Sequence, residues 1–258
     1  MKFQLIAFFF LIFFFVFILL FLYLGIYSAR RNVKNKKISA NSGLQIVEGS
    51  IFTLLGLIVA FTFSSANQRF DQRRYLIIEE ANAIRTADLR IDLARPEIQK
   101  NLHQDLKQYL SYQIDNYRQI SDFETFRLTH MKSLAMQKKI WKLVSKECTA
   151  KYQENKCSLL LSAFNKMFDI ANTRYEYSYV HPPVIIFLLL VGLALLGALL
   201  AGYNIGETKG GTILHLVSYA LVIATTIYII IDLELPRLGF IRVDSFDAVI
   251  TELYQNMT

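Results

Sequence analysis

The residues that could do chemistry in this chain are concentrated in one stretch, RFDQRRYLIIEEANAIRTADLR, at residues 69–90. Acids and bases alternate there, so the stretch could attract ions, hold a charged ligand or dock a partner. Asp71 and Arg74 stand three residues apart, as do Arg85 and Asp88, and such pairs partly neutralise each other on a helix. Exposed pairs contribute only about 0.3–0.5 kcal/mol each, so an ordinary solvated face explains most of these charges. The candidate residues of this charged motif are Arg69, Asp71, Arg73, Arg74, Glu79, Glu80, Asn82, Arg85 and Arg90.

Patterns of catalytic and metal-binding residues are missing from the sequence. The four histidines, at positions 103, 130, 181 and 215, are scattered without the spacing of metal ligands. Neither the G-x-S-x-G pattern nor the phosphate-binding G-x-x-x-x-G-K-[ST] pattern occurs, and NIGETKGG at 204–211 is typical of a tight turn. We therefore predict no enzymatic activity, no metal site and no cofactor. Glu79, Glu80 and Asn82, set between small alanines, are not explained as a solvated face.

Four long apolar runs indicate the class of protein. They cover residues 3–27, 44–63, 184–201 and 212–231, and each is close to the roughly 20 residues that cross a bilayer core. The first run could be a cleaved signal peptide, but it far exceeds the usual length of about 7–15 apolar residues, which favours a retained anchor. The net charge of +7 could suggest nucleic acid. Much of it flanks the runs, where Lys and Arg set topology, so we predict no nucleic-acid partner.

The second apolar run has small and polar residues along one helical face. Gly49, Thr53, Gly56, Ala60, Ser64 and Asn67 follow one another at steps of four, three, four, four and three. Two interpretations stay open: a seam where helices pack closely, or a pore-lining or oligomer face. Glu48, beside this face near the membrane boundary, could form an ion-attracting ring or serve as an interfacial anchor.

The segment after the second run is predicted to be helical. Residues 57–95 contain no Gly or Pro, which favours one continuous helix, and Phe70, Ile77, Ile84 and Ile91 recur every seventh residue as a stripe that would be buried. Pro96 is expected to end or kink this helix. Further helices are predicted near 97–120, 125–146 and 157–179, and His181-Pro182-Pro183 breaks the chain again. The predicted regions are the first two spans at 1–66 with a basic loop at 28–42, an extramembrane helical domain at 67–182, the last two spans at 183–233, and a tail at 234–258.

The basic loop suggests an orientation. Arg30, Arg31, Lys34, Lys36 and Lys37 favour a cytoplasmic loop, which places the domain 67–182 in the periplasm. Cys148 and Cys157, nine residues apart, would suit that oxidising compartment as a small disulfide loop. Two free thiols that never meet are the alternative.

Two segments resemble a known family. Arg69-Phe-Asp71-x-Arg73-Arg74 with Glu79-Glu80-Ala81-Asn82-Ala83-Ile84 and Thr86-Ala87-x-Leu89-Arg90, and the tail Asp232-Leu-Glu-Leu-Pro236-Arg237-x-Gly239-x-Ile241-x-Val243, are similar to motifs of the bestrophin-like domain family of bacterial membrane proteins. Arg85 departs from the expected Gly, and Asp88 from a larger or aromatic residue. The resemblance implies a distant similarity to bestrophins, pentameric anion channels with four spans and a large cytoplasmic region. That location conflicts with the orientation that the basic loop favours.

From these observations we predict an all-α membrane protein with four transmembrane helices and a helical extramembrane domain inserted between the second and third spans. The predicted function is an oligomeric ion channel of the bacterial inner membrane, conducting anions along the second span and its charged extension. The rival hypothesis is a non-conducting scaffold or sensor whose helical domain binds a partner or ligand. The predicted partners are the lipid bilayer, further copies of the chain and inorganic ions.

Overall fold

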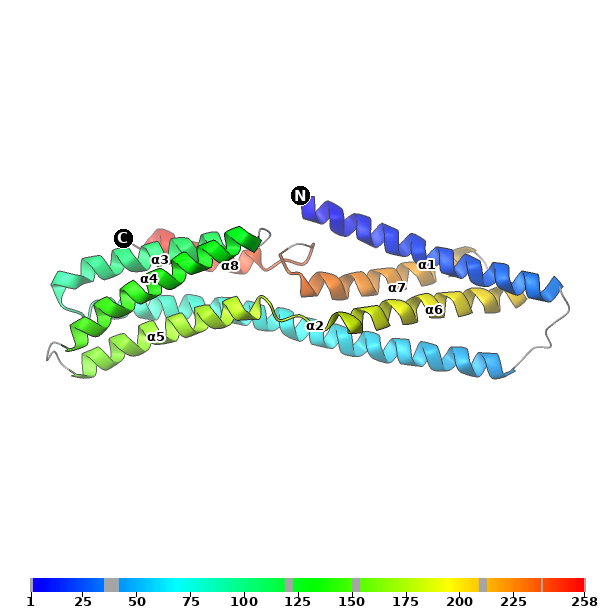
Figure 1. Cartoon of the computed structure of the whole chain (residues 1–258), viewed down its shortest axis with the longest axis horizontal. Coiled ribbons are helices and arrows are strands. Elements are labelled where there is room, and N and C mark those ends of the chain that lie inside the picture. Colours follow the sequence, from blue (N-terminus) through cyan, green and yellow to red (C-terminus); the bar gives the residue numbers. More distant parts are fainter. Residues whose placement is uncertain are drawn as a thin grey trace. The chain divides into compact units, whose positions relative to one another are not determined.

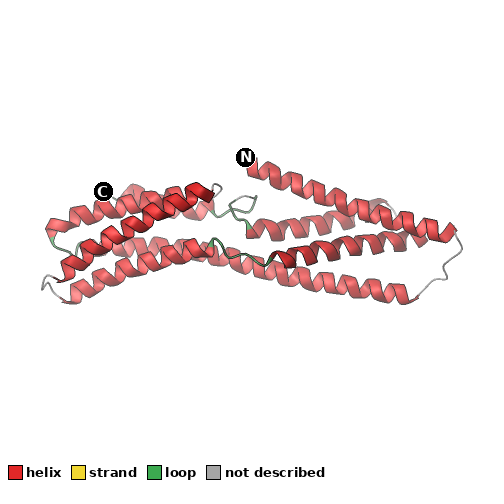
Figure 2. Cartoon of the chain, viewed as in Figure 1, coloured by secondary structure: helices red, strands yellow, loops and turns green. Residues whose placement is uncertain are grey.

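The computed structural model describes residues 2–34, 42–118, 123–149, 154–208, 213–237 and 239–257, and in these ranges it contains helices and no strand (Figure 2). The predicted all-helical class is confirmed. The helices, labelled in Figure 1, are α1 Lys2–Lys34, α2 Ser42–Ile91, α3 Pro96–Arg118, α4 Phe123–Thr149, α5 Glu154–Tyr177, α6 Val184–Thr208, α7 Ile213–Glu234 and α8 Asp244–Asn256. The chain divides into unit 1, Met1–Phe70 with His181–Ile241, and unit 2, Asp71–Val180 with Arg242–Thr258.

Unit 1 is built from apolar helices. Within the described residues, α1, α2, α6 and α7 are each long and apolar enough to cross a membrane. Large apolar side chains such as Phe9 and Ile213 are exposed on them, at 66% and 78%. Exposure of this extent over many residues is typical of a surface that faces lipid or another protein.

Helices α1 and α6 of unit 1 approach each other through glycines. A side chain on Gly25 would collide with the backbone oxygen of Leu199, and one on Gly202 with that of Leu22. Small residues let helix backbones come this close when both helices are apolar. The interpretation of NIGETKGG as a tight turn is therefore wrong for its first half, because α6 runs through Gly206 to Thr208 and packs there. Residues 209–212 lie outside the described residues.

The basic loop predicted at 28–42 also begins later than expected. Helix α1 continues to Lys34, so Arg30 and Arg31 belong to its last turns. A helix is favourable there because the preceding apolar residues are already helical and Arg and Lys are good helix formers. Lys36 and Lys37 lie outside the described residues.

Unit 2 is a bundle of α3, α4, α5 and α8 with the second part of α2. The predicted stripe on α2 is buried: Ile77, Ile84 and Ile91 are at most 1% exposed. Helix α2 ends at Ile91 and Pro96 opens α3, at a position where its missing N–H is not needed. The break at 181–183 is confirmed as well, since α5 ends at Tyr177 and α6 begins at Val184. Helix α8, in the predicted tail, was not expected from the sequence.

Candidate functional site

The small face of the second span is exposed along its whole length. All six of its residues, from Gly49 to Asn67, are exposed in the chain. A Cβ atom added to Gly49 or to Gly56 would meet no other described atom within 4 Å. Thr53 donates its hydroxyl to the carbonyl oxygen of Gly49 at 2.8 Å. A packing seam within the chain therefore does not account for this face, which is open to lipid, to water or to another protomer.

Glu48 lies beside this face and is bound to a different helix. Its carboxylate accepts a hydrogen bond from Asn204 Nδ2 of α6 at 3.0 Å. On the same side of α2, the ring of Phe52 lies edge-on to Tyr219 of α7. Glu48 thus lies on the side of α2 that packs against its own unit, which suits an anchor better than a ring of acids around a pore.

Beyond residue 67, the exposed face continues at the same helical spacing. Its members are Asp71, Tyr75, Ile78, Asn82, Arg85 and Leu89, all exposed. The predicted pair of Asp71 with Arg74 forms, at 3.2 Å. The predicted pair of Arg85 with Asp88 does not form among the described residues, because Asp88 lies 3.0 Å from His103 Nδ1 instead. No hydrogen-bond acceptor or acid contacts the Arg85 guanidinium within the described ranges.

The other arginines of the motif are bound to protein. Arg69 donates its Nε and Nη2 to Glu234 Oε1 at 2.8 and 2.5 Å, and Arg73 donates to the carbonyl oxygen of Val180 at 3.0 Å. Arg90 donates to the carbonyl oxygen of Leu159 and to Ser162, at 2.7 and 3.1 Å.

Arg74 combines its ion pair with an aromatic contact. Its guanidinium lies over the Phe246 ring of α8, 4.4 Å from the centroid. The charged motif is therefore largely a set of anchors for neighbouring segments, and Arg85 differs from the rest.

Glu80 belongs to an ion network in unit 2 that is centred on Arg174. Glu80 is fully buried and accepts a hydrogen bond from Arg174 Nη1 at 2.6 Å, and the same guanidinium also contacts Asp247 of α8. The Tyr117 ring of α3 lies under that guanidinium, 3.6 Å from its centre. Burial alone lowers the pKa of Arg174, but the charges of Glu80 and Asp247 outweigh it and raise that pKa above its ordinary value.

The network explains why two acids that are adjacent in the sequence differ in burial and in partners. Glu80 is an acid held by its partner, whereas Glu79 is only partly buried. Burial, with the nearby charge of Glu80, also raises the pKa of Tyr109 in the core. No pattern in the sequence pointed to Arg174 and Asp247, which belong to helices far away along the chain.

The tail motif has a local structural role. Asp232 accepts hydrogen bonds from the Tyr228 hydroxyl and from the backbone N–H groups of Phe240 and Ile241, at 2.7–3.1 Å. Any side chain at Gly239 would collide with the Asp232 carboxylate. Aspartate and glycine at this spacing therefore turn the chain back after α7, and Glu234 in the same motif binds Arg69 of the first motif.

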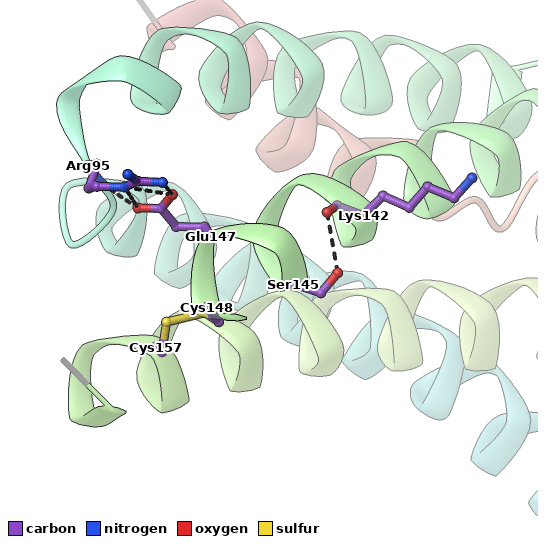
Figure 3. Close-up of a disulfide and its surroundings, with 6 residues drawn as sticks. All are labelled: Arg95, Lys142, Ser145, Glu147, Cys148 and Cys157. Atoms are coloured by element: carbon purple, nitrogen blue, oxygen red, sulfur yellow. Dashed lines mark hydrogen bonds and ion pairs between the residues drawn. A yellow bond between two sulfur atoms is a disulfide. The ribbon is translucent and has the colours of Figure 1, made fainter. Parts of the chain in front are cut away.

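Cys148 and Cys157 form a disulfide, with 5.4 Å between their Cα atoms, that joins the end of α4 to the start of α5 (Figure 3). The neighbouring Glu147 accepts three hydrogen bonds from the Arg95 side chain and one from its backbone N–H (Figure 3). The Arg95 hydrogen bonds lower the pKa of Glu147 despite the opposing effect of its burial.

No cluster of acidic, His or Cys side chains with the geometry of a metal site occurs among the described residues.

Comparison with known proteins gives one family and several similar structures. Residues 11–246 match the Bestrophin-like domain family. Two structures of mutants of a bacterial Bestrophin homolog from Klebsiella pneumoniae are similar, with TM-scores of 0.72 and 0.73 at 15% identity, covering 96% of this chain and 98% and 97% of theirs. A structure described as that of a membrane protein has a TM-score of 0.70 at 16% identity, covering 95% and 96%. No curated protein matches the sequence.

Proposed function

The chain belongs to the Bestrophin-like domain family, and on that premise we propose that it is an oligomeric channel conducting anions across the bacterial inner membrane. The pathway follows α2, first along the small face and then along the charged extension. The predicted arrangement is kept: four spans, with the extramembrane domain 67–182 inserted between the second and third. Further copies of the chain and inorganic ions are its partners.

One observation supports this proposal most: the small face of α2 is exposed although it contains hydroxyl and amide groups. Thr53, Ser64 and Asn67 lie on it, and polar side chains within a span usually face a bundle interior or water rather than lipid. Symmetric copies placed around an axis would cover this face without any packing inside the protomer. The glycines and Ala60 would keep such a path wide enough for an ion.

The anion preference is proposed to come from Arg85. Arg69, Arg73 and Arg90 are engaged by protein groups, whereas Arg85 is exposed on the face that continues from the span. A guanidinium keeps its charge at every physiological pH, so it would attract anions and repel cations along the pathway.

The orientation is proposed to be periplasmic for the domain 67–182. Arg30 and Arg31 at the end of α1 favour the cytoplasm for that end. The disulfide between Cys148 and Cys157 suits an oxidising compartment. Labelling of single cysteines from each side of the membrane, in a variant without the native pair, would test this orientation.

Currents across planar bilayers containing the purified protein test the function. We expect chloride currents above those of bilayers fused with empty liposomes, under varied salt, pH and voltage. Cryo-electron microscopy of the same sample should place the face of Gly56 and Ser64 around a continuous axis. An oligomer whose axis is sealed by lipid or side chains, with no current, would instead favour the scaffold or sensor.

A further inference from the structure

Helices α2, α6 and α7 of unit 1 enclose a pocket with a volume of about 420 Å³. Its walls are mostly apolar and include Ile58, Phe61, Ile186, Phe187 and Ile230. A volume of this size lies in the range of pockets that hold small ligands. Along α2 the pocket extends from Ile58 to Arg69, about 16 Å at 1.5 Å per residue, which suits a long and narrow occupant.

The pocket is distinct from the proposed pathway. Besides Phe61, its α2 residues are Ile58, Thr62, Ser65 and Arg69, which are spaced by four, three and four residues. At about 100° per residue they lie on the side of α2 opposite to the small face. A ligand here would therefore not lie among the residues proposed to conduct ions.

One end of the pocket is polar. Arg69, His181 and Glu234 line it there, and Glu234 is 4% exposed at its side chain. The two bonds to Glu234 use Nε and Nη2 of Arg69, and no described residue accepts a hydrogen bond from its Nη1. His181 has 41% of its side chain exposed, with its Nδ1 3.7 Å from Glu234 Oε2. Two nitrogen-bearing side chains therefore stand together where the apolar walls end.

We propose that this pocket binds one membrane glycerophospholipid, with an acyl chain between the apolar walls and the phosphodiester at Arg69 and His181. An acyl chain leaving the bilayer gains packing contacts with the apolar walls rather than hydrophobic transfer energy, and a fixed guanidinium is well matched to phosphate oxygens. The ion pair with Glu234 positions the guanidinium and leaves the site close to electrical neutrality. Recognition then depends on the phosphodiester and the acyl chain rather than on net lipid charge.

Native mass spectrometry of the full chain in detergent tests this site, with dioleoyl phosphatidylglycerol, dioleoylglycerol or inorganic phosphate added. We expect one phosphatidylglycerol per protomer to be retained, about tenfold weaker retention of dioleoylglycerol, which lacks the phosphodiester, and no retained phosphate. Ile186→Trp fills the pocket and should abolish retention. Leu188→Trp is the matched control, because Leu188 is exposed on the same helix but does not line the pocket.

Arg69→Gln and His181→Ala test the polar end. Each should weaken phosphatidylglycerol retention by about tenfold and leave dioleoylglycerol unchanged. His181→Ala decides the question if Arg69→Gln fails to fold. Equal retention by the Ile186→Trp and Leu188→Trp variants would overturn the proposal. So would a change of oligomer mass in Ile186→Trp with lipid retention unaltered, which would identify a second protomer as the occupant.

Discussion

Glu80 and Arg174 are 94 residues apart in the chain, and their side chains meet at 2.6 Å in the interior of unit 2. The pair joins α2 to α5, and Asp247 extends it to α8. Glu80 and Arg174 are buried there, whereas Asp247 is 23% exposed at its side chain. Removal of Arg174 would therefore leave Glu80 without its counter-charge, and removal of Glu80 would leave the guanidinium only the more exposed Asp247. The buried pair is thus a determinant of the domain's stability rather than a group that an ion or ligand could reach.

Glu80→Ala is expected to lower the free energy of unfolding by about 3–5 kcal/mol, because it leaves the Arg174 guanidinium partly uncompensated in the core. Glu79→Ala, at the neighbouring and less buried position, should change it by less than about 0.5 kcal/mol. Thermal unfolding followed by circular dichroism in detergent measures both. Equal effects of the two substitutions would contradict the assigned role of Glu80.

Gly56→Leu is expected to abolish or strongly reduce the current, because the leucine would project from the small face into the proposed pathway. Gly192→Leu on α6 is the matched control, since a side chain there also meets no described atom within 4 Å. Both changes replace a helical glycine by a better helix former, so neither should unfold the protein. Single-channel conductance of the two variants gives the answer, and an equal loss in both would remove α2 from the pathway.

Arg85→Gln is expected to reduce the permeability of chloride relative to sodium by roughly fivefold. That factor corresponds to the interaction of about 1 kcal/mol between two unit charges about 4 Å apart in water. Arg127→Gln removes another exposed arginine, on α4, whose guanidinium forms an i,i+3 pair, and should leave selectivity unchanged. Reversal potentials in a salt gradient distinguish the two, and an unchanged ratio in Arg85→Gln would exclude Arg85 as the source of selectivity.

The ion pair of Glu147 with Arg95 predicts a pH dependence of stability. The folded pKa of this carboxyl lies below its ordinary value of about 4.5, so its stabilisation is complete above that pH and is lost as pH falls through the folded pKa. Glu147→Gln should therefore unfold at a lower temperature than the wild type at pH 7, with the difference shrinking below about pH 4.5. A difference that is the same at pH 7 and pH 3 would contradict the pair's contribution.

Reduction of the disulfide is expected to destabilise unit 2 by about 2–3 kcal/mol, the loop-entropy value for so short a closed loop. The Cys148→Ser, Cys157→Ser double variant should then unfold at the temperature of the reduced wild type. The measurement is thermal unfolding with and without dithiothreitol. A double variant that still responds to dithiothreitol would show that the reagent acts elsewhere.

Local patterns in the sequence predicted most helices, because helix periodicity and breakers act over a few residues. The stripe of Phe70, Ile77, Ile84 and Ile91 is buried as its seven-residue spacing indicates, and Pro96 stands at a helix start. The spacing of the small face identified its six residues as one surface, and the structure adds that the surface is not covered by its own chain.

Long-range partners could not be predicted in the same way. Nothing near Glu80 in the sequence points to Arg174, and Asp88 pairs with His103 rather than with the closer Arg85. The glycines of NIGETKGG suggested a turn because glycine usually breaks helices, yet Gly206 of this segment is required where α6 meets α1, as is Gly202 just before it. Such choices are decided by packing between distant segments, which one sequence does not display.

Of the three engaged arginines along α2, Arg69 is paired with an acid, whereas Arg73 and Arg90 donate to uncharged oxygens and keep their charge. At physiological ionic strength the field of an exposed charge fades over about 8 Å. A passing ion would then respond to the few side chains near it and not to the total charge of the motif. On the proposed pathway, conduction should accordingly depend on ionic strength through the charges within that distance of the ion, and not through the sum of all charges along the helix.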